Sequence, residues 1–266
     1  MNIKRELRTW WPFLVLLPLF AGLANYQRPS VRQARLDAKL VAAVHSHDTS
    51  AAIEALNAGA NPNVRDYYRP LPTLLIRLRH PDAAKLDDAI HAQEWDPVLV
   101  SAVVFGNDGG PSNQNAKIVQ ALLQHGAQIN GVDFGGSTAL SFAAAQGNLR
   151  LTKELLDHGA AINTQNRYRY TPLMNTGWPP SVALTRLLLT HGANPNLQGV
   201  DGETALMVAC GQRRPDIVRL LLQHGADPNL RETPRKGIST TALQMEQMRP
   251  RPNPILGRLL KQYGAK

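Results

Sequence analysis

The sequence is poor in the residue types that build redox and metal centres. It contains one cysteine, Cys210, among 266 residues. A single thiol excludes an intramolecular disulfide, iron–sulfur clusters and zinc sites that need two or four cysteines. Aromatic residues make up only 6% and charged residues 18% of the chain, whereas hydrophobic residues reach 43% and are spread along its length. This composition argues against general disorder and against a protein with many membrane spans.

The charge is unbalanced towards basic residues. The chain has 29 lysines and arginines against 20 aspartates and glutamates, a formal net charge of +9. Residues 1–24 hold three of these basic and one of these acidic side chains, so the rest of the chain keeps a formal charge of +7. Such a surface favours acidic proteins, anionic lipid headgroups or nucleic acid as neighbours, although a solvated basic face without a ligand also accounts for it.

The N-terminal segment, residues 1–26, has the pattern of a targeting or anchoring segment. Three basic residues, Lys4, Arg5 and Arg8, precede a stretch without charge over residues 10–24. A basic region before an apolar one is the entry signal for the secretory machinery. A helix needs about 17 to 20 residues to span a bilayer, and the stretch reaches that length only when it is counted through Tyr26. Residues 1–26 are therefore expected to be a signal peptide or a membrane anchor.

This segment leaves three interpretations open. Gly22 and Ala24 are small residues that suit a cleaved signal peptide. Aromatic residues at both ends, Trp10, Trp11 and Tyr26, resemble the interfacial anchors of a retained single-pass helix over residues 10–26. The third interpretation is an apolar cap on a cytosolic domain. The leading expectation is an N-terminal hydrophobic helix in a membrane or, after cleavage, a periplasmic or secreted protein, with residues 27–34 as a linker.

The strongest signal is an internal repeat. The string Leu-Leu-x-His-Gly-Ala recurs with its glycine at positions 126, 159, 192 and 225, so the spacing is constant. Apolar residues precede each glycine in i, i+4 pairs, as at Ile217, Val218, Leu221 and Leu222. This pattern predicts a helix with one apolar face that ends at the glycine. A Thr-Ala-Leu or Thr-Pro-Leu string predicts a shorter, capped helix before it. The unit of turn, short helix, turn and longer helix, with a period of roughly 33 residues, defines an all-α solenoid.

This unit resembles the ankyrin repeat, whose pattern is Thr-Pro-Leu-His, Ala-Ala, Leu-Leu-x-x-Gly-Ala-Asp and Asn. Residues 136–163 and 202–229 follow the pattern closely. The resemblance implies a solenoid of stacked helix-turn-helix units over residues 35–266, with about six or seven repeats.

Two repeats are expected to be irregular. The interval from Gly59 to Gly126 is close to twice the repeat period, which leaves room for two helix pairs, so the repeat over 71–96 would be degenerate and lack its Gly-Ala end. The interval from Gly225 to Gly264 is longer than one period. The last repeat, over 238–266, is therefore interpreted as a C-terminal cap, whose outer face meets water.

No catalytic or metal-binding constellation accompanies the repeats. The histidines that precede the repeat glycines lie in layers about 10 Å apart, too far from one another for a zinc ion with ligands about 2 Å away. We expect structural roles for them at the helix ends, and a buried, inert thiol at Cys210. The chain is therefore expected not to be an enzyme and to need no cofactor and no metal. The histidines are His125, His158, His191 and His224.

Aromatic residues and arginines are expected on the binding surface that the resemblance implies. Ankyrin-like arrays bind through their turn fingers and first helices, and the family usually has glycine where Arg69 and Arg169 stand. Tyrosine, tryptophan and arginine dominate interface hot spots. In the structural alternative, the tyrosines pack finger against finger and the arginines stack on them. The predicted partner-binding residues are Tyr67, Tyr68, Arg69, Phe134, Arg167, Tyr168, Arg169, Tyr170 and Trp178.

The leading hypothesis is a non-enzymatic scaffold for protein–protein interaction, displayed at or across a membrane through residues 10–26. The concave face and the turn fingers would bind another protein with an acidic or mixed surface, and the chain itself is expected to be a monomer. The alternative is a basic surface that binds anionic lipid or nucleic acid, although the sequence holds no nucleic-acid motif and nucleic acid is not the expected partner.

Overall fold

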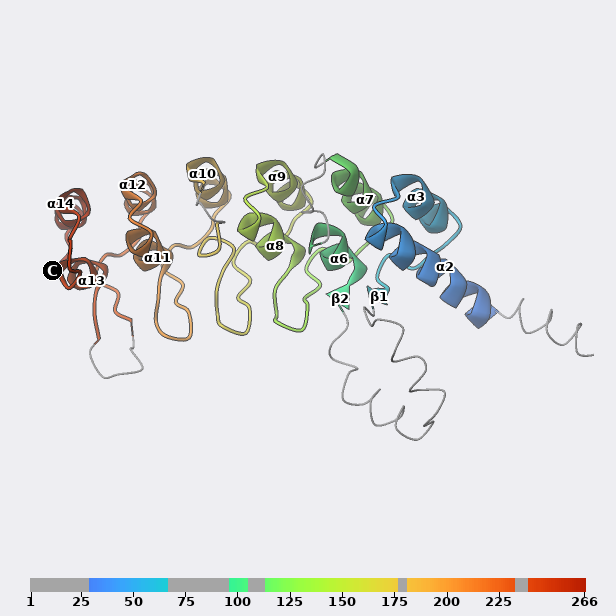
Figure 1. Cartoon of the computed structure of the whole chain (residues 1–266), viewed down its shortest axis with the longest axis horizontal. Helices are drawn as coiled ribbons and strands as arrows, with labels where there is room; N and C mark the ends of the chain where they lie inside the picture. The colour runs from blue at the N-terminus through green and yellow to red at the C-terminus, as the bar shows by residue number, and fades with distance from the viewer. Residues whose placement is uncertain (1–28, 67–95, 105–112, 177–180, 233–238) are drawn as a thin grey trace, which may run out of the picture.

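The computed structural model describes residues 29–66, 96–104, 113–176, 181–232 and 239–266. In these residues, short α-helices form pairs that stack side by side into an elongated array (Figure 1). An outer row of helices runs along one side, an inner row lies beneath it, and loops project beyond the inner row as fingers. The expected all-α solenoid is confirmed.

Six layers follow one another among the described residues. The inner helices are α2 (Pro29–His45), α6 (Val98–Val104), α8 (Ala139–Ala145), α11 (Ala205–Gly211) and α13 (Ala242–Gln247). The outer helices are α3 (Thr49–Asn57), α7 (Asn113–Gln124), α9 (Leu149–Asp157), α10 (Val182–Thr190), α12 (Pro215–Gln223) and α14 (Pro254–Gln262). The fourth layer has turns over residues 172–175, before α10 in the chain, at the position where the other layers have an inner helix.

The inner helices begin where the Thr-x-Leu strings predict. The hydroxyl oxygen of Thr138 accepts the N–H of Ser141 at 3.2 Å, and that of Thr204 accepts the N–H of Met207 at 3.3 Å. Each bond satisfies one of the N–H groups that a helix start leaves without an intrahelical acceptor. The helix ends also follow prediction, since Gly225 takes the left-handed conformation at φ +84° after α12.

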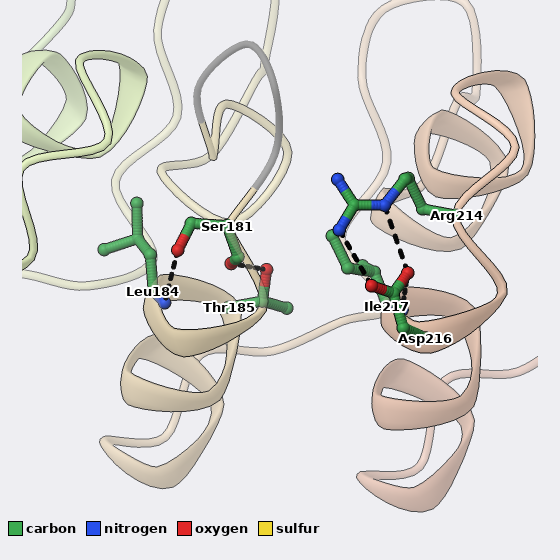
Figure 2. A network of polar contacts seen from close by, with 6 residues as sticks. All are labelled: Ser181, Leu184, Thr185, Arg214, Asp216 and Ile217. Atoms are coloured by element: carbon green, nitrogen blue, oxygen red, sulfur yellow. Dashed lines mark hydrogen bonds and ion pairs between the residues drawn. The ribbon is translucent and has the colours of Figure 1, made fainter.

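Neighbouring outer helices use different caps (Figure 2). Ser181 caps α10 by accepting the N–H of Leu184 at 3.3 Å. Helix α12 begins instead with Pro215, and the preceding Arg214 binds Asp216 at 2.7 Å. The hydrogen bond from Arg214 holds the pKa of Asp216 below its ordinary value, so this carboxylate stays charged beside the positive end of the helix dipole.

The core is continuous but divides into two clusters of buried residues. The first runs from Leu40 to Ala160 and the second from Ala144 to Leu260. Leu156 and Ile162 pack against both clusters and connect them. Since each layer contacts only its neighbours, the stability of the array is a sum of local terms, and the third and fourth layers meet where the two clusters join.

Asparagines join each layer to the next. The Oδ1 atom of Asn196 accepts the N–H of Asp227 at 2.8 Å, and its Nδ2 atom donates to the carbonyl oxygen of Gly225 at 2.9 Å. The same pair of bonds recurs at Asn63, Asn163 and Asn229. These bonds set the position of each finger on the layer that follows it.

Asn196→Ala is expected to lower the free energy of unfolding by about 1 to 2 kcal/mol, because it leaves an N–H and a carbonyl group of the next layer without their partner. Urea denaturation followed by circular dichroism measures the change. Asn194→Ala is the matched control, since the Oδ1 atom of Asn194 accepts only the N–H of Asn196 within its own finger, and a loss as large as that of Asn196→Ala would argue against the interlayer role.

The stack passes directly from the first layer to the layer of α6 and α7. Helix α2 packs on α6, and α3 packs on α7. Strand β1 (Arg65–Asp66) pairs in antiparallel fashion with β2 (Asp96–Pro97), so these two short strands lie side by side at the base of one finger. The degenerate repeat expected over 71–96 stays a prediction, because residues 67–95 lie outside the described part.

The repeated histidines have the structural role that the sequence predicts. The Nδ1 atoms of His158, His191 and His224 each bind the carbonyl oxygen four residues earlier, at 2.8 to 2.9 Å. Each of these carbonyl oxygens also accepts the backbone N–H of the same histidine, at 3.1 to 3.2 Å, so the ring adds a second bond that fixes the side chain at the helix end. Within the described ranges, no group of three histidine, cysteine or acidic side chains is placed to hold a metal ion.

Cys210 is a buried thiol, as expected. Its side chain is 1% exposed, and burial, with a smaller contribution from the charge of Glu246, raises the pKa of Cys210 to about 12. A thiol with this pKa is almost fully protonated at neutral pH, and the thiolate is the nucleophilic form.

None of the described helices is both long and apolar enough to cross a membrane. The predicted signal peptide or anchor over residues 1–26 lies outside the described residues.

Candidate functional site

The fingers of the third, fourth and fifth layers are tied to one another through their backbones. The N–H of Arg167 donates to the carbonyl oxygen of Gly135 at 2.8 Å, and the N–H of Val200 donates to that of Tyr168 at 3.0 Å. Gln165 adds a side-chain bond from the fourth finger to the carbonyl oxygen of Gln198, at 3.0 Å. The three tips therefore form one connected edge, which we call the fingertip row and define as Phe134, Arg167, Tyr168, Arg169 and Val200.

Phe134 and Arg167 form a contact between two fingers. The guanidinium carbon of Arg167 lies 4.1 Å from the centre of the Phe134 ring, and its Nη2 atom donates to the carbonyl oxygen of Phe134 at 2.8 Å. This cation–π pair fixes both side chains. Because half of the Phe134 surface remains exposed, the ring still offers an apolar face to a partner.

Tyr168 is the most exposed aromatic side chain of the fingertip row, at 63%. Its backbone N–H donates to Oδ1 of Asn166 at 3.0 Å, which holds the main chain while the ring points away from the core. An exposed tyrosine on a fixed backbone covers a large area of a partner at small cost in side-chain entropy.

Arg169 occupies a backbone position that the neighbouring fingers give to glycine. Its φ is +58°, and the residues one repeat period away on either side, Gly136 and Gly202, have φ of +76° and +77°. A residue with a Cβ atom pays roughly 1 kcal/mol for this left-handed conformation. Arg169 is thus a strained, exposed residue that follows Tyr168 in the chain, and such strain is common at binding sites.

Arg169→Gly is expected to raise the free energy of unfolding by about 0.5 to 1 kcal/mol, because glycine adopts this conformation without strain. The same variant is expected to bind the partner at least about fivefold more weakly, since a charged hot-spot side chain is lost. Denaturant unfolding and partner titration measure the two effects. Arg213→Gly is the matched control: Arg213 has φ +59° in the turn before α12, away from the fingertips, and should gain stability without losing affinity.

Tyr170 joins two fingers rather than facing solvent. Its hydroxyl donates to Oε2 of Glu203 at 2.6 Å, and a Cβ atom on Gly199 would lie only 2.7 Å from the Tyr170 ring. The hydrogen bond to Glu203, followed by burial, raises the pKa of Tyr170 to about 12, so the phenol remains a donor. For Tyr170 and for the Arg167 pair with Phe134, the structure matches the alternative in which these side chains pack finger against finger.

Four of the predicted partner-binding residues cannot be placed. All four lie outside the described residues. Three of them follow β1 in the chain, Tyr67, Tyr68 and Arg69, and the fourth is Trp178, which precedes α10. The structure brings together Phe134, Arg167, Tyr168 and Arg169. It adds Val200, which is 55% exposed and which sequence reasoning missed. The signal was present, because Phe134, Arg167 and Val200 follow one another at the interval of the repeat.

The described fingers do not carry the basic excess of the chain. Over residues 60–66, 96–97, 127–138, 160–171, 193–204, 226–232 and 239–241 they hold four arginines and seven carboxylates. The fingertip row itself has Arg167 and Arg169 beside apolar side chains. The expectation of a basic concave face therefore does not hold for the described fingers, whose charge is mixed.

Acidic residues gather at the base of the first fingers. Asp66 is buried and accepts a hydrogen bond from Nε2 of His45 at 2.5 Å. Partial burial, followed by the charges of Asp133 and Asp66, raises the pKa of Asp96 above its ordinary value. The folded protein therefore binds the Asp96 proton more tightly than the unfolded chain does, and ionisation of Asp96 above that pKa lowers stability.

Asp96→Asn is expected to raise the melting temperature at pH 7, because it removes the buried charge. The gain should disappear as the pH falls through the raised pKa towards the ordinary value of 3.8, since Asp96 is then already neutral. Thermal unfolding at several pH values tests this. Asp157→Asn serves as control, because Lys153 lowers the pKa of Asp157 and its removal should give no gain at pH 7.

Comparison with known families matches the part of the chain that holds the fingertip row. Residues 122–174 match a family described as ankyrin repeats in many copies, and residues 171–232 match one described as ankyrin repeats in three copies. No curated protein matches the chain. The two matched ranges together cover the third, fourth and fifth layers.

Proposed function

We propose that this protein is a binding scaffold whose partner protein docks on the fingertip row. Residues 122–232 match ankyrin-repeat families, and ankyrin repeats generally mediate contacts between proteins without catalysis. The observation that carries the proposal is the fixed, exposed edge of Phe134, Tyr168 and Val200. Side chains that are already ordered before binding lose little entropy when a partner arrives.

The chemistry of the row defines the kind of partner. Phe134, Tyr168 and Val200 offer apolar area, and the exposed Arg167 and Arg169 add guanidinium groups to the same row. A guanidinium binds a carboxylate through two parallel hydrogen bonds. We expect a partner with an apolar patch and one or two carboxylates within it, rather than a uniformly acidic surface.

The place of action in this proposal is a membrane. The support is the basic flank and uncharged stretch over residues 1–26, which is typical of an anchor or a signal peptide. Cell fractionation with an intact-mass measurement tests it. Full-length protein in the membrane fraction would indicate an anchor, processed protein outside it would indicate a cleaved signal, and full-length soluble protein would contradict membrane display.

The binding proposal is tested by quantitative capture. Wild-type protein and a Phe134→Ala, Tyr168→Ala variant are used as baits at equal folded concentration, and captured proteins are quantified by mass spectrometry. The expected result is a protein that the wild type enriches at least about tenfold over the variant. A matched Ile255→Ala, Tyr263→Ala bait, altered at the exposed end of the stack, should capture it as the wild type does. Equal capture by all three baits would contradict the proposed site.

A further inference from the structure

Basic side chains recur at one position of the outer helices. Six residues before the repeat glycine stand Lys153 in α9, Arg186 in α10, Arg219 in α12 and Arg258 in α14, and all four are exposed. These helices pack one against the next along the outer side of the array (Figure 1), at axis separations of about 10 Å. The four side chains therefore form a line, which we call the basic row.

Acidic residues neutralise the basic row only in part. Lys153 pairs with Asp157 of its own helix at 2.7 Å. In α12, Asp216 is held by Arg214 (Figure 2). Helix α10 contains no acidic residue, and α14 carries Lys261 in addition to Arg258 and no acidic residue. The row thus keeps a positive charge.

Exposed apolar side chains stand at both ends of the basic row. Leu149 is 41% exposed and lies four residues before Lys153, and Ile255 is 48% exposed and lies three residues before Arg258. At these spacings the paired side chains share one helix face. Exposed apolar side chains beside basic ones are typical of surfaces that lie in the headgroup region of a membrane.

From this arrangement we infer that the basic row binds the anionic headgroups of a lipid bilayer. Lipids diffuse laterally, so their headgroups can pair with single positive charges spaced about 10 Å apart. Nucleic acid is less favoured as the occupant, because the row has no aromatic side chains on which bases could stack. The uncharged stretch over residues 10–24 argues for the same occupant, since stable membrane attachment usually needs two signals. In this respect the inference rests on the proposed membrane placement. The fingers project from the other side of the inner helices (Figure 1), so a bilayer on the row leaves them open to a partner.

The test compares vesicles of phosphatidylcholine with vesicles in which about one third of the lipid is phosphatidylglycerol. Full-length chain is used, and co-sedimentation measures the partition coefficient. Neutral vesicles report on the uncharged stretch of the N-terminal segment. The ratio between the two vesicle types reports on basic residues, which include Lys4, Arg5 and Arg8, so the part of the ratio that a row variant loses reports on the basic row. Each arginine near an anionic surface contributes roughly a fivefold gain at low salt, so the ratio should be at least about tenfold, and should vanish near 1 M salt, where the screening length is about 3 Å.

The decisive variant is Arg186→Gln, Arg219→Gln, Arg258→Gln, which should lower the preference for anionic vesicles at least about tenfold. The matched control, Arg65→Gln, Arg213→Gln, Arg231→Gln, removes the same charge elsewhere and should keep the preference. Two vesicle results would overturn the inference: an equal loss of the anionic preference in both variants, or a wild-type ratio near one. It would also be overturned if the row variant bound vesicles as the wild type does but bound duplex DNA more weakly. Partner capture is measured in parallel, and its persistence in the row variant separates this inference from the binding proposal.

Discussion

Tyr168→Ala is expected to weaken partner binding by about 30-fold and to leave the free energy of unfolding within about 0.5 kcal/mol of the wild type. The side chain is 63% exposed, so its removal opens no cavity. In the complex, the ring would be covered by the partner, and exposed aromatic anchors of this kind cost about 2 kcal/mol when truncated. Titration of the captured partner against the variant, with unfolding measured on the same sample, gives both values.

Two further variants separate a specific effect from a general one. Tyr263→Ala removes a tyrosine that is 36% exposed after α14, and should leave affinity unchanged. Tyr170→Phe removes only the hydroxyl that binds Glu203, and should lower stability by about 1 to 2 kcal/mol because Glu203 loses a donor. A similar loss of affinity in Tyr168→Ala and Tyr263→Ala would mean that the partner does not dock on the fingertip row.

Leu188→Ala is expected to lower the free energy of unfolding by about 3 kcal/mol, the largest stability effect among the substitutions considered. Leu188 is fully buried in α10, and truncation of a buried leucine leaves a cavity that typically costs about 2 to 5 kcal/mol. The fourth layer has turns over 172–175 rather than an inner helix, so α10 has fewer groups that could close the cavity.

The same variant should change the shape of the unfolding curve. Because repeats interact only with their neighbours, a weakened fourth layer is expected to split unfolding into two transitions, one for each core cluster. Urea unfolding and hydrogen exchange measure this. Thr190→Ala in the same helix is the control, since its exposed hydroxyl binds only carbonyl groups of α10. A single transition with a loss below about 1 kcal/mol would contradict the role given to this layer.

The repeat predicted most of the fold, because its signals are local. The capping threonines, the left-handed glycines and the apolar i, i+4 pairs each act within one turn of helix, and all of them appear where the repeat period places them. The packing of one helix on another was predicted less well. Sequence spacing does not show that α3 packs on α7 or that β1 pairs with β2, because both contacts join segments far apart in the chain.

The candidate site was predicted in part, and the misses have a physical reason. Composition at a fingertip suggested Tyr168 and Arg169, whose exposure depends only on their place in the turn. Composition did not distinguish the exposed Tyr168 from Tyr170, which packs on the next finger. The orientation of the Tyr170 ring depends on Glu203 and Gly199 of that finger. Val200 was missed because a valine in the sequence does not indicate a binding surface, and only the structure shows that this one is exposed.

A photo-crosslinking side chain at position 168 shows directly whether a partner protein docks on the fingertip row. The benzophenone analogue of phenylalanine is introduced there in living cells of the source organism, and at position 223 on α12 as a comparison site on the outer row. We expect one dominant crosslinked protein from position 168. It should be absent from position 223 and strongly reduced when Arg169→Gly is combined with the crosslinker. The same protein crosslinked from position 223 and not from position 168 would contradict the proposed site, since the partner would then lie on the outer helices and not on the fingertip row.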